Sequence, residues 1–224
     1  MAGRFITFEG GEGAGKSTQI GRLKGRLEQL SQRVLVTREP GGSPYAEEIR
    51  AFILGGHAKS LGTFAEALLF AAARIDHLDK TIVPALKAGT HVLCDRFADS
   101  TRAYQGSAGN IDPALIDRLE RVTLAGTKPD LTFILDLPAE TGLARASARA
   151  AQKGEGADRF EDEALSFHQN LRQAFLAIAR AHPQRCAVIN ADQSADEVEA
   201  AIWATLRERL PELTRNEERP LDVA

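Results

Sequence analysis

The chain has 224 residues, enough for one sizeable hydrophobic core, and nothing in its length requires a second domain. Its formal net charge of −3 and pI near 6.0 exclude a protein whose main task is to coat nucleic acid. Because no apolar stretch approaches the ~20 residues of a membrane span, and Met1 to Arg4 lead into a strand-like run without a signal peptide, we expect a soluble cytoplasmic protein with no membrane partner.

Short apolar runs alternate with helical patterns along the chain, which predicts an α/β fold with a mostly parallel sheet. The expected strands are residues 5–9, 34–37, 91–95, 131–135 and 186–189. The expected helices are residues 16–30, 44–54, 62–87, 113–124, 139–149, 161–181 and 195–210. The expected helix start signals are Ser17 or Thr18, Asp112-Pro113, and Ser194 with Glu197. We therefore expect three layers, with helices on both faces of a five-stranded parallel sheet, a single domain over residues 1–214, and a flexible tail over residues 215–224.

A glycine-rich loop follows the first predicted strand and has the spacing of a phosphate-binding loop, Gly10-x-x-x-x-Gly15-Lys16-Ser17. In such a loop the backbone N–H groups wrap a triphosphate, Lys16 reaches the β- and γ-phosphates, and the Ser17 hydroxyl can hold Mg²⁺. The helix that follows adds the positive end of its dipole. The motif predicts a nucleoside triphosphate site formed by Gly10, Gly11, Glu12, Gly13, Ala14, Gly15, Lys16, Ser17 and Thr18.

Two polar motifs end the second and third predicted strands, Arg38-Glu39-Pro40-Gly41-Gly42 and Asp95-Arg96. Parallel strands bring their carboxyl ends to the edge of the sheet where ligands collect. Asp95 resembles the acidic residue that lies near Mg²⁺ in such sites, with the Arg96 guanidinium available for a phosphate. Taken alone, the first motif indicates an ordinary turn by default, and the second is equally explained by a salt bridge between neighbours at a strand end.

The long predicted helix at 62–87 presents one apolar stripe, which suits either a core or a subunit interface. The stripe consists of Phe64, Leu68, Ala71, Ile75, Leu78 and Ile82. Phe70 and Arg74 lie off it and four residues apart, so they share another face of the helix. An aromatic ring beside a guanidinium suits a planar base, although a second core contact plus a solvated arginine is the alternative.

The segment 150–157 is polar and contains glycine, and basic residues surround it: Arg145, Arg149, Lys153 and Arg159. Such a segment is either a solvated surface loop or, beside a triphosphate site, a lid that closes over phosphates and excludes water. We place the predicted lid at about residues 145–160.

Together these motifs closely resemble those of bacterial thymidylate kinases, which belong to the P-loop nucleoside monophosphate kinases. The resemblance runs in the same order from Phe8 to about Asp196. Its most specific parts are the Arg38-Glu39-Pro40-Gly41-Gly42 turn and a block that begins at Asp95-Arg96-Phe97. The matched sequences are Phe8-Glu9-Gly10, Lys16-Ser17-Thr18, Thr37-Arg38-Glu39-Pro40-Gly41-Gly42, Leu68-Leu69-Phe70-Ala71-Ala72-Ala73-Arg74, Asp95-Arg96-Phe97 and Ser100-Thr101-Arg102-Ala103-Tyr104-Gln105-Gly106.

The resemblance implies Mg²⁺-dependent transfer of a phosphoryl group from ATP to dTMP, direct and in line, by a homodimer. Lys16 and Ser17 would hold the ATP phosphates and the metal, and Asp95 would support the metal. The residues implied for dTMP are Glu12, Arg38, Glu39, Arg50, Phe70, Arg74, Arg96, Ser100, Thr101, Tyr104 and Gln105. The segment Asn190-Ala191-Asp192-Gln193 resembles the loop that touches adenine.

One position separates two groups within this family. Some members carry a catalytic arginine in the phosphate-binding loop, where this chain has Gly13 followed by Ala14. The chain therefore resembles the group with catalytic arginines in the lid, and the candidates are Arg145, Arg149, Lys153 and Arg159. With Lys16, Asp95 and Arg96, the arginines among them form the predicted catalytic set.

Three other functions share parts of this pattern. Another nucleoside monophosphate or deoxynucleoside kinase would share everything except the base pocket. A GTPase switch requires Asn-Lys-x-Asp and Asp-x-x-Gly motifs, and neither occurs in the chain. A non-catalytic ATP-binding regulator would not need Lys16, Ser17, Asp95 and Arg96 together.

Overall fold

Five parallel strands form the central sheet of the computed structural model, in the order β2-β3-β1-β4-β5. The structure describes residues 2–153 and 163–215. The strands are β1 (Phe5–Glu9), β2 (Val34–Arg38), β3 (His91–Asp95), β4 (Leu131–Asp136) and β5 (Cys186–Asn190). Each agrees with its predicted range to within one residue, which confirms the predicted fold class.

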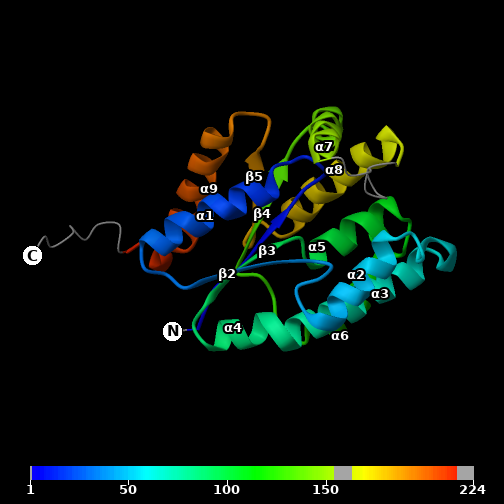
Figure 1. Cartoon of the computed structure of the whole chain (residues 1–224), viewed down its shortest axis with the longest axis horizontal. Coiled ribbons are helices and arrows are strands. Elements are labelled where there is room, and N and C mark those ends of the chain that lie inside the picture. The colour runs from blue at the N-terminus through cyan, green and yellow to red at the C-terminus, as the bar shows by residue number, and fades with distance from the viewer. Residues whose placement is uncertain (1, 154–162, 216–224) are drawn as a thin grey trace, which may run out of the picture.

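Helices cover both faces of the sheet, as Figure 1 shows. On one face lie α1 and α9, and on the other lie α3, α4, α6 and α8. The bounds are α1 (Lys16–Gln29), α2 (Pro44–Leu54), α3 (Thr63–His77), α4 (Val83–Lys87), α5 (Ala98–Thr101), α6 (Pro113–Leu124), α7 (Ala139–Lys153), α8 (Leu165–Ala181) and α9 (Ala195–Arg209). Among the described residues, none of these helices is long and apolar enough to span a membrane.

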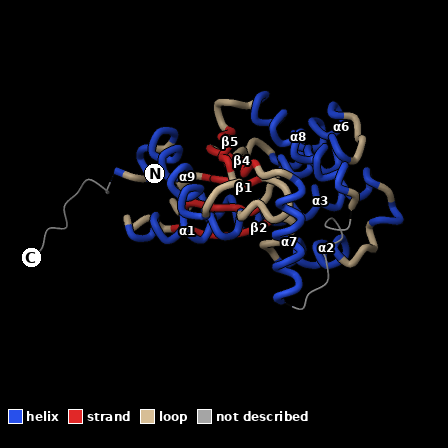
Figure 2. The backbone as a smooth tube through the Cα atoms, turned by 90° about the horizontal axis from the view of Figure 1, so that it is seen from above, coloured by secondary structure: helices blue, strands red, loops and turns tan. Residues whose placement is uncertain are grey.

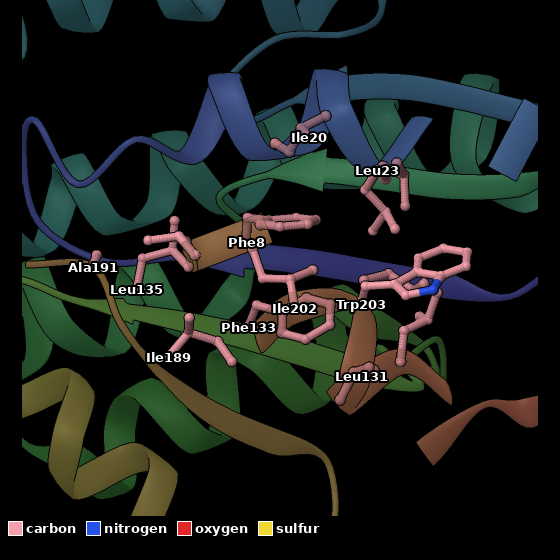
Figure 3. Packing of buried hydrophobic residues seen from close by; sticks show 14 of the residues in the cluster. Phe8, Ile20, Leu23, Leu131, Phe133, Leu135, Ile189, Ala191, Ile202 and Trp203 are labelled. Carbon is pink, nitrogen blue, oxygen red and sulfur yellow. The ribbon is translucent and has the colours of Figure 1, made fainter. Parts of the chain in front are cut away.

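The largest apolar cluster fills the layer between the sheet and helices α1 and α9. Figure 3 shows side chains of this cluster from the sheet, Phe8 and Phe133, together with Leu23 of α1 and Ile202 and Trp203 of α9. Because successive side chains of a strand point to opposite faces, Phe5 joins a second cluster on the other side of the sheet. Burial on both faces explains why the strands read as nearly continuous apolar runs.

The register of the strands brings three of the predicted motifs to one edge. Asp95 at the end of β3 lies opposite both Phe8 of β1 and Arg38 of β2. The phosphate-binding loop, the 38–42 turn and Asp95-Arg96 therefore all leave the sheet at its carboxyl edge, where open parallel sheets bind ligands.

One predicted helix differs from the structure in its interior, and two helical segments of the structure were not predicted. The helix expected over 62–87 is α3 and α4 joined by a π-helical stretch, η2 (Leu78–Ile82). Pro84 explains the irregularity, because proline has no N–H to donate to the preceding turn. The helix α5 and the π-helical η3 (Arg102–Ala108) that continues it were not predicted at all.

The two helices on either side of the predicted lid also differ from their predicted bounds. Helix α7 extends to Lys153, four residues beyond the predicted end, whereas α8 begins at Leu165 rather than at Glu161. Ala164 is extended, with ψ of 149°, so the helix cannot start before it. The rest of the predicted lid, residues 154–162, and most of the predicted tail, residues 216–224, lie outside the described residues.

Candidate active site

The phosphate-binding loop joins β1 to α1 with the backbone that its glycines permit. Gly10, Gly13 and Gly15 have positive φ angles of 137°, 65° and 88°. Lys16 Nζ donates hydrogen bonds to the carbonyl oxygens of Gly10 at 3.2 Å and Gly11 at 2.9 Å. Burial lowers the pKa of Lys16 below its ordinary value. The loop thus holds a buried amine at the turn where the motif predicts phosphates.

The start of α1 has no side-chain cap. Its N-cap is Gly15, and no side chain caps it, so the start signal expected from Ser17 or Thr18 is wrong. The first N–H groups of any helix lack partners within the helix. Uncapped by side chains and at the positive end of the dipole, those of α1 suit a phosphate oxygen.

Helix α7 packs directly against the phosphate-binding loop. A Cβ atom added at Gly13 would lie 2.1 Å from the carbonyl oxygen of Gly142, and one added at Gly142 would lie 2.4 Å from the carbonyl oxygen of Glu12. In Figure 2, α7 lies close to the loops above the central strands. Gly13 therefore cannot be replaced by a larger residue without moving α7, and the loop has no room for an arginine at this position.

The predicted lid arginines have different surroundings. Arg145, on α7, donates a hydrogen bond to the carbonyl oxygen of Ala191 at 3.2 Å and lies 4.0 Å from the Asp192 carboxylate. It therefore meets the 190–193 segment that resembles an adenine loop. Arg149 is exposed one turn further along α7. Lys153 ends the helix, and Arg159 lies outside the described residues.

The predicted metal residues, Ser17 and Asp95, are in contact. The Ser17 hydroxyl donates to Asp95 Oδ2 at 2.8 Å. A hydroxyl and a carboxylate are hard oxygen donors, which Mg²⁺ prefers, and they stand beside the phosphate-binding loop. This donor set fits a Mg²⁺ ion that also binds substrate phosphates.

Arg96 is the centre of a second group of contacts, here called the Arg96 cluster and formed with Glu12 and Tyr104. Its Nη2 donates to Glu12 Oε1 at 2.6 Å, and the Tyr104 hydroxyl donates to the same oxygen at 2.7 Å. Its Nη1 donates to the carbonyl oxygen of Gly10 at 3.2 Å, and the guanidinium lies 5.0 Å from the centre of the Tyr104 ring. Asp95 and Arg96 thus have separate partners, Ser17 and Glu12, and do not form the salt bridge considered as an alternative.

Glu12 stays ionised in this cluster. Burial alone would raise the pKa of its carboxyl group, but the charges of Arg96 and Lys16 and the Tyr104 hydrogen bond lower it to about 2. The same ion pair raises the pKa of Arg96 against the effect of burial. The cluster therefore keeps a fixed positive guanidinium next to the phosphate-binding loop.

A third group of contacts, the Glu39 cluster, surrounds the predicted base pocket and contains Glu39, Arg74, His77 and Thr101. Arg74 is 3 % exposed; its Nε donates to Glu39 Oε2 at 2.7 Å and its Nη2 to the Thr101 hydroxyl at 3.0 Å. His77 Nδ1 lies 3.1 Å from Glu39 Oε1. The alternative of a solvated arginine is therefore wrong, because Arg74 is buried and paired.

The remaining residues implied for dTMP lie on neighbouring elements. Phe70 is half-buried on α3, one turn before Arg74. Gln105 is buried in η3 and donates to Glu66 of α3 at 2.9 Å. Arg50 donates to the carbonyl oxygen of Pro40 at 2.7 Å. Arg38, at the end of β2, lies opposite Asp95, the residue before Arg96, and its exposed Nη2 donates to both carboxylate oxygens of Glu47 at 3.0 Å.

Three buried polar residues of this region were not identified from the sequence. They are Glu9 at the end of β1, Glu66 beside Gln105, and His77 at the end of α3. Each had a usable signal, since each is a charged or titratable residue within an otherwise apolar pattern. Their partners lie far away in the sequence: Ser100 is 91 residues from Glu9, and Gln105 is 39 residues from Glu66. Only the structure therefore shows which residues they contact.

Comparison with known proteins agrees with this geometry. Residues 8–202 match the thymidylate kinase family. The chain is 60 % identical over 209 residues to the thymidylate kinase of Bradyrhizobium diazoefficiens, a match that covers 93 % of this chain and 90 % of that protein. It is 59 % identical over 208 residues to that of Nitrobacter winogradskyi, covering 92 % and 89 %.

A solved structure gives the same result. The crystal structure of thymidylate kinase from Ehrlichia chaffeensis superposes with a TM-score of 0.74 at 33 % identity, covering 92 % of this chain and all of that one. The matched region includes the phosphate-binding loop, the Arg96 cluster and the Glu39 cluster. The chain therefore belongs to the thymidylate kinase family and is a kinase.

Proposed function

We propose that the chain transfers the γ-phosphoryl group of ATP to dTMP and releases ADP and dTDP. The observation that carries this proposal is the direct contact between the phosphate-binding loop and the Arg96 cluster. Arg96 binds both Gly10 and Glu12, two residues of the loop itself. A phosphate bound by Arg96 would therefore lie beside one bound by Lys16, as transfer between them requires.

The chemistry requires charge neutralisation more than proton transfer. The phosphate of dTMP is an anion near neutral pH, so no general base is needed. Lys16 and the first N–H groups of α1 bind the donor phosphates, and Arg96 binds the acceptor phosphate. Fixed positive charges in a site closed to water stabilise the charge that develops during transfer. A Mg²⁺ ion held by Ser17 and Asp95 would supply a further positive charge bound to the ATP phosphates.

The base pocket is proposed at the Glu39 cluster and η3. Glu39 and Thr101 hold the Arg74 guanidinium in one orientation, so that one of its three remaining N–H groups can donate to a ring carbonyl. Phe70 supplies a ring for stacking, and Ser100, Tyr104 and Gln105 complete the wall. Tyr104 would leave little room for a 2′-hydroxyl group, which favours a deoxynucleotide.

The charge that other family members supply from the phosphate-binding loop is proposed to come from α7. Gly13 has no room for a side chain, whereas Arg145 and Arg149 stand four residues apart on the helix that packs against it. A lid over the site also keeps water from accepting the phosphoryl group.

We propose further that two copies associate through α3. Phe64, Leu68 and Ile75 of its apolar stripe are 44 %, 44 % and 51 % exposed, whereas Ala71, Leu78 and Ile82 of the same stripe are buried. A row of exposed apolar residues on one helix is typical of a subunit interface. Sedimentation equilibrium should give twice the chain mass, and Leu68→Glu should give a monomer.

The experiment that tests the reaction is ADP release from Mg-ATP with dTMP, dUMP, UMP, CMP, AMP or GMP, and without acceptor. Strong preference for dTMP supports both the reaction and the base pocket. Turnover with a different monophosphate would retain the phosphate site and refute the pocket. ADP release without any acceptor would show an ATPase.

A further inference from the structure

Glu9, the last residue of β1, carries a buried carboxyl group that the proposed reaction does not use. It is 0 % exposed. Its Oε1 accepts a hydrogen bond from the backbone N–H of Phe97 at 2.8 Å, and its Oε2 lies 2.6 Å from the Ser100 hydroxyl, which donates to it when the carboxyl group is ionised. Acidic side chains are almost never fully buried without partners. Both partners of Glu9 belong to the segment that follows Arg96.

The segment that begins at Arg96 has an uncommon backbone conformation and a helix start without a side-chain cap. Arg96 has φ of 67°, a left-handed conformation that residues other than glycine rarely adopt. Phe97, the next residue, is the N-cap of α5 and has no side-chain acceptor to cap it. The end of β1 supplies what is missing, because the carbonyl oxygen of Phe8 accepts from Arg96 N–H at 2.9 Å and Glu9 accepts from Phe97 N–H.

The position of this turn sets the direction of two side chains that the reaction needs. From the left-handed position, Arg96 reaches Gly10 and Glu12 of the phosphate-binding loop. Helix α5 continues into η3, which carries Tyr104, the second partner of Glu12. The carboxyl group of Glu9 therefore ties the acceptor side of the site to the strand from which the phosphate-binding loop begins.

We propose that Glu9 is a positioning residue, whose carboxyl group holds the Arg96 turn and the Ser100 hydroxyl in register with the phosphate-binding loop. The inference rests on the proposed function, in which Arg96 binds the acceptor phosphate. Glu9 touches neither substrate, and it acts through Phe97 and Ser100.

The proton of Glu9 has a defined role in this arrangement. Burial, followed by the nearby charge of Asp99, raises its pKa to about 8, against the opposing effects of Ser100, Arg96 and Phe97. Protonated Glu9 donates from Oε2 to Ser100 Oγ, which leaves the Ser100 hydroxyl hydrogen free. Ionised Glu9 instead accepts that hydrogen. Since Ser100 Oγ is 3.5 Å from Arg96 Nη1, the free hydrogen lies beside the proposed phosphate position.

The titration of Glu9 depends on the charged groups around it. Asp99 is held by Arg185, which approaches from the start of β5. Burial raises the pKa of two nearby thiols, Cys94 and Cys186, so they stay neutral. The charged and titratable groups that interact with Glu9 are Asp99, Arg96, Lys16, Cys94 and Cys186.

Steady-state kinetics of Glu9→Ala and Glu9→Gln test the proposal, with Glu208→Gln, an exposed change on α9, as the matched control. Glu9→Ala should lower kcat about 100-fold, the size expected when a catalytic group is misplaced by about 1 Å. The KM for ATP should not change, because Lys16 and α1 are untouched. Glu9→Gln should recover most of kcat, since its amide oxygen accepts from Phe97 and its amide N–H donates to Ser100.

A pH profile gives a second reading that a purely structural role would not produce. The unchanged chain should lose kcat as the pH rises through about 8, where Glu9 ionises. The Glu9→Gln variant cannot ionise there and should keep its rate. The same loss of rate in both would refute the role of the proton.

Amide hydrogen exchange of peptides spanning 96–108 tests the positioning without any substrate. Faster exchange in Glu9→Ala than in Glu9→Gln or Glu208→Gln is expected. Equal exchange and equal kcat in all three variants would overturn the proposal. If Glu9→Ala does not fold, the pH profile and the amide hydrogen exchange of Glu9→Gln test the proposal instead. If the unchanged chain releases no ADP with dTMP, the proposed function fails, and hydrogen exchange still shows whether Glu9 holds this segment.

Discussion

Phe8 and Glu9 are neighbours in β1, yet they point to opposite faces of the sheet and into two differently built regions. Phe8 enters the apolar layer beneath α1 and α9, where side chains are held by packing. Glu9 belongs to the polar region above the carboxyl edge, where Glu12, Arg96 and Tyr104 are held by hydrogen bonds of 2.6 to 2.7 Å. One residue step along a strand separates the two.

The difference predicts how each region responds to change. Packing between apolar side chains is non-directional, so a truncation in the apolar layer should cost stability and leave the chemistry of the folded molecules intact. The polar edge positions the charges that the chemistry needs, so a change there should lower kcat of the molecules that remain folded, in addition to any loss of stability from a broken buried pair. The predictions below test that separation.

The largest expected effect is at Lys16. Lys16→Ala should lower kcat about 1,000-fold, the upper end of what one preorganised donor contributes. The fold should survive, because the contacts of Lys16 Nζ are two backbone carbonyl oxygens of its own loop. Lys24→Ala on the exposed side of the same helix is the control. Near-normal turnover of Lys16→Ala, with an unchanged circular dichroism melt, would refute the assignment of the phosphate site.

Phe133→Ala should show the opposite behaviour. The side chain is fully buried in the apolar layer, so its removal should lower the free energy of unfolding by about 3–5 kcal/mol. Urea unfolding measures this loss. The kcat per folded molecule should match that of the unchanged chain, and a large fall in kcat would show that the two regions are coupled.

The stability of the polar edge should depend on pH through Glu12. Its pKa is lowered from 4.5 to about 2, so its ionised form stabilises the fold at any pH above 4.5. That contribution, about 3 kcal/mol, should be lost as the pH falls from 4.5 to 2. Glu12→Gln should flatten this part of the stability curve. An unchanged acid transition in the variant would mean that Glu12 carries no such linkage.

Arg149→Ala tests the charge proposed to come from α7. It should lower kcat about 100-fold and change the KM for dTMP little, as expected for a group that acts mainly in the transition state. Arg180→Ala at the end of α8 is the control. Equal losses in affinity and rate would indicate a binding role instead.

The smallest expected effect is at the helix cap that follows the 190–193 segment. Ser194 accepts from the backbone of Glu197, and Glu197 accepts from the backbone of Ser194, which forms a capping box at the start of α9. Ser194→Ala should lower the free energy of unfolding by about 1 kcal/mol with no change in kcat. Ser194→Thr keeps the hydroxyl group and should restore most of the stability.

Much of the fold could be predicted because local pattern decides it. The predicted strands agree with the structure to within one residue, because short apolar runs bounded by turn residues are typical of buried strands. The caps at Asp112 and Ser194 were also predicted, because a cap is a contact between residues two or three positions apart. The η3 helix was missed, since it is held by packing on α8 rather than by local propensity.

The candidate site shows the same division between local contacts and long-range contacts. Sequence by itself determined the phosphate-binding loop, because its residues are consecutive and the backbone conformation follows from the glycines. It also determined that no arginine stands at Gly13, and the structure adds the reason, which is the contact with Gly142.

Only the tertiary structure decided which charged residues are paired. It joined Arg96 to Glu12 across 84 positions and Arg74 to Glu39 across 35, and it paired Arg38 with Glu47. It also showed that Glu9 supports the Arg96 turn. The physical reason is that local backbone preferences depend on neighbours in the chain, whereas the partner of a buried charge depends on which strand ends the sheet brings together.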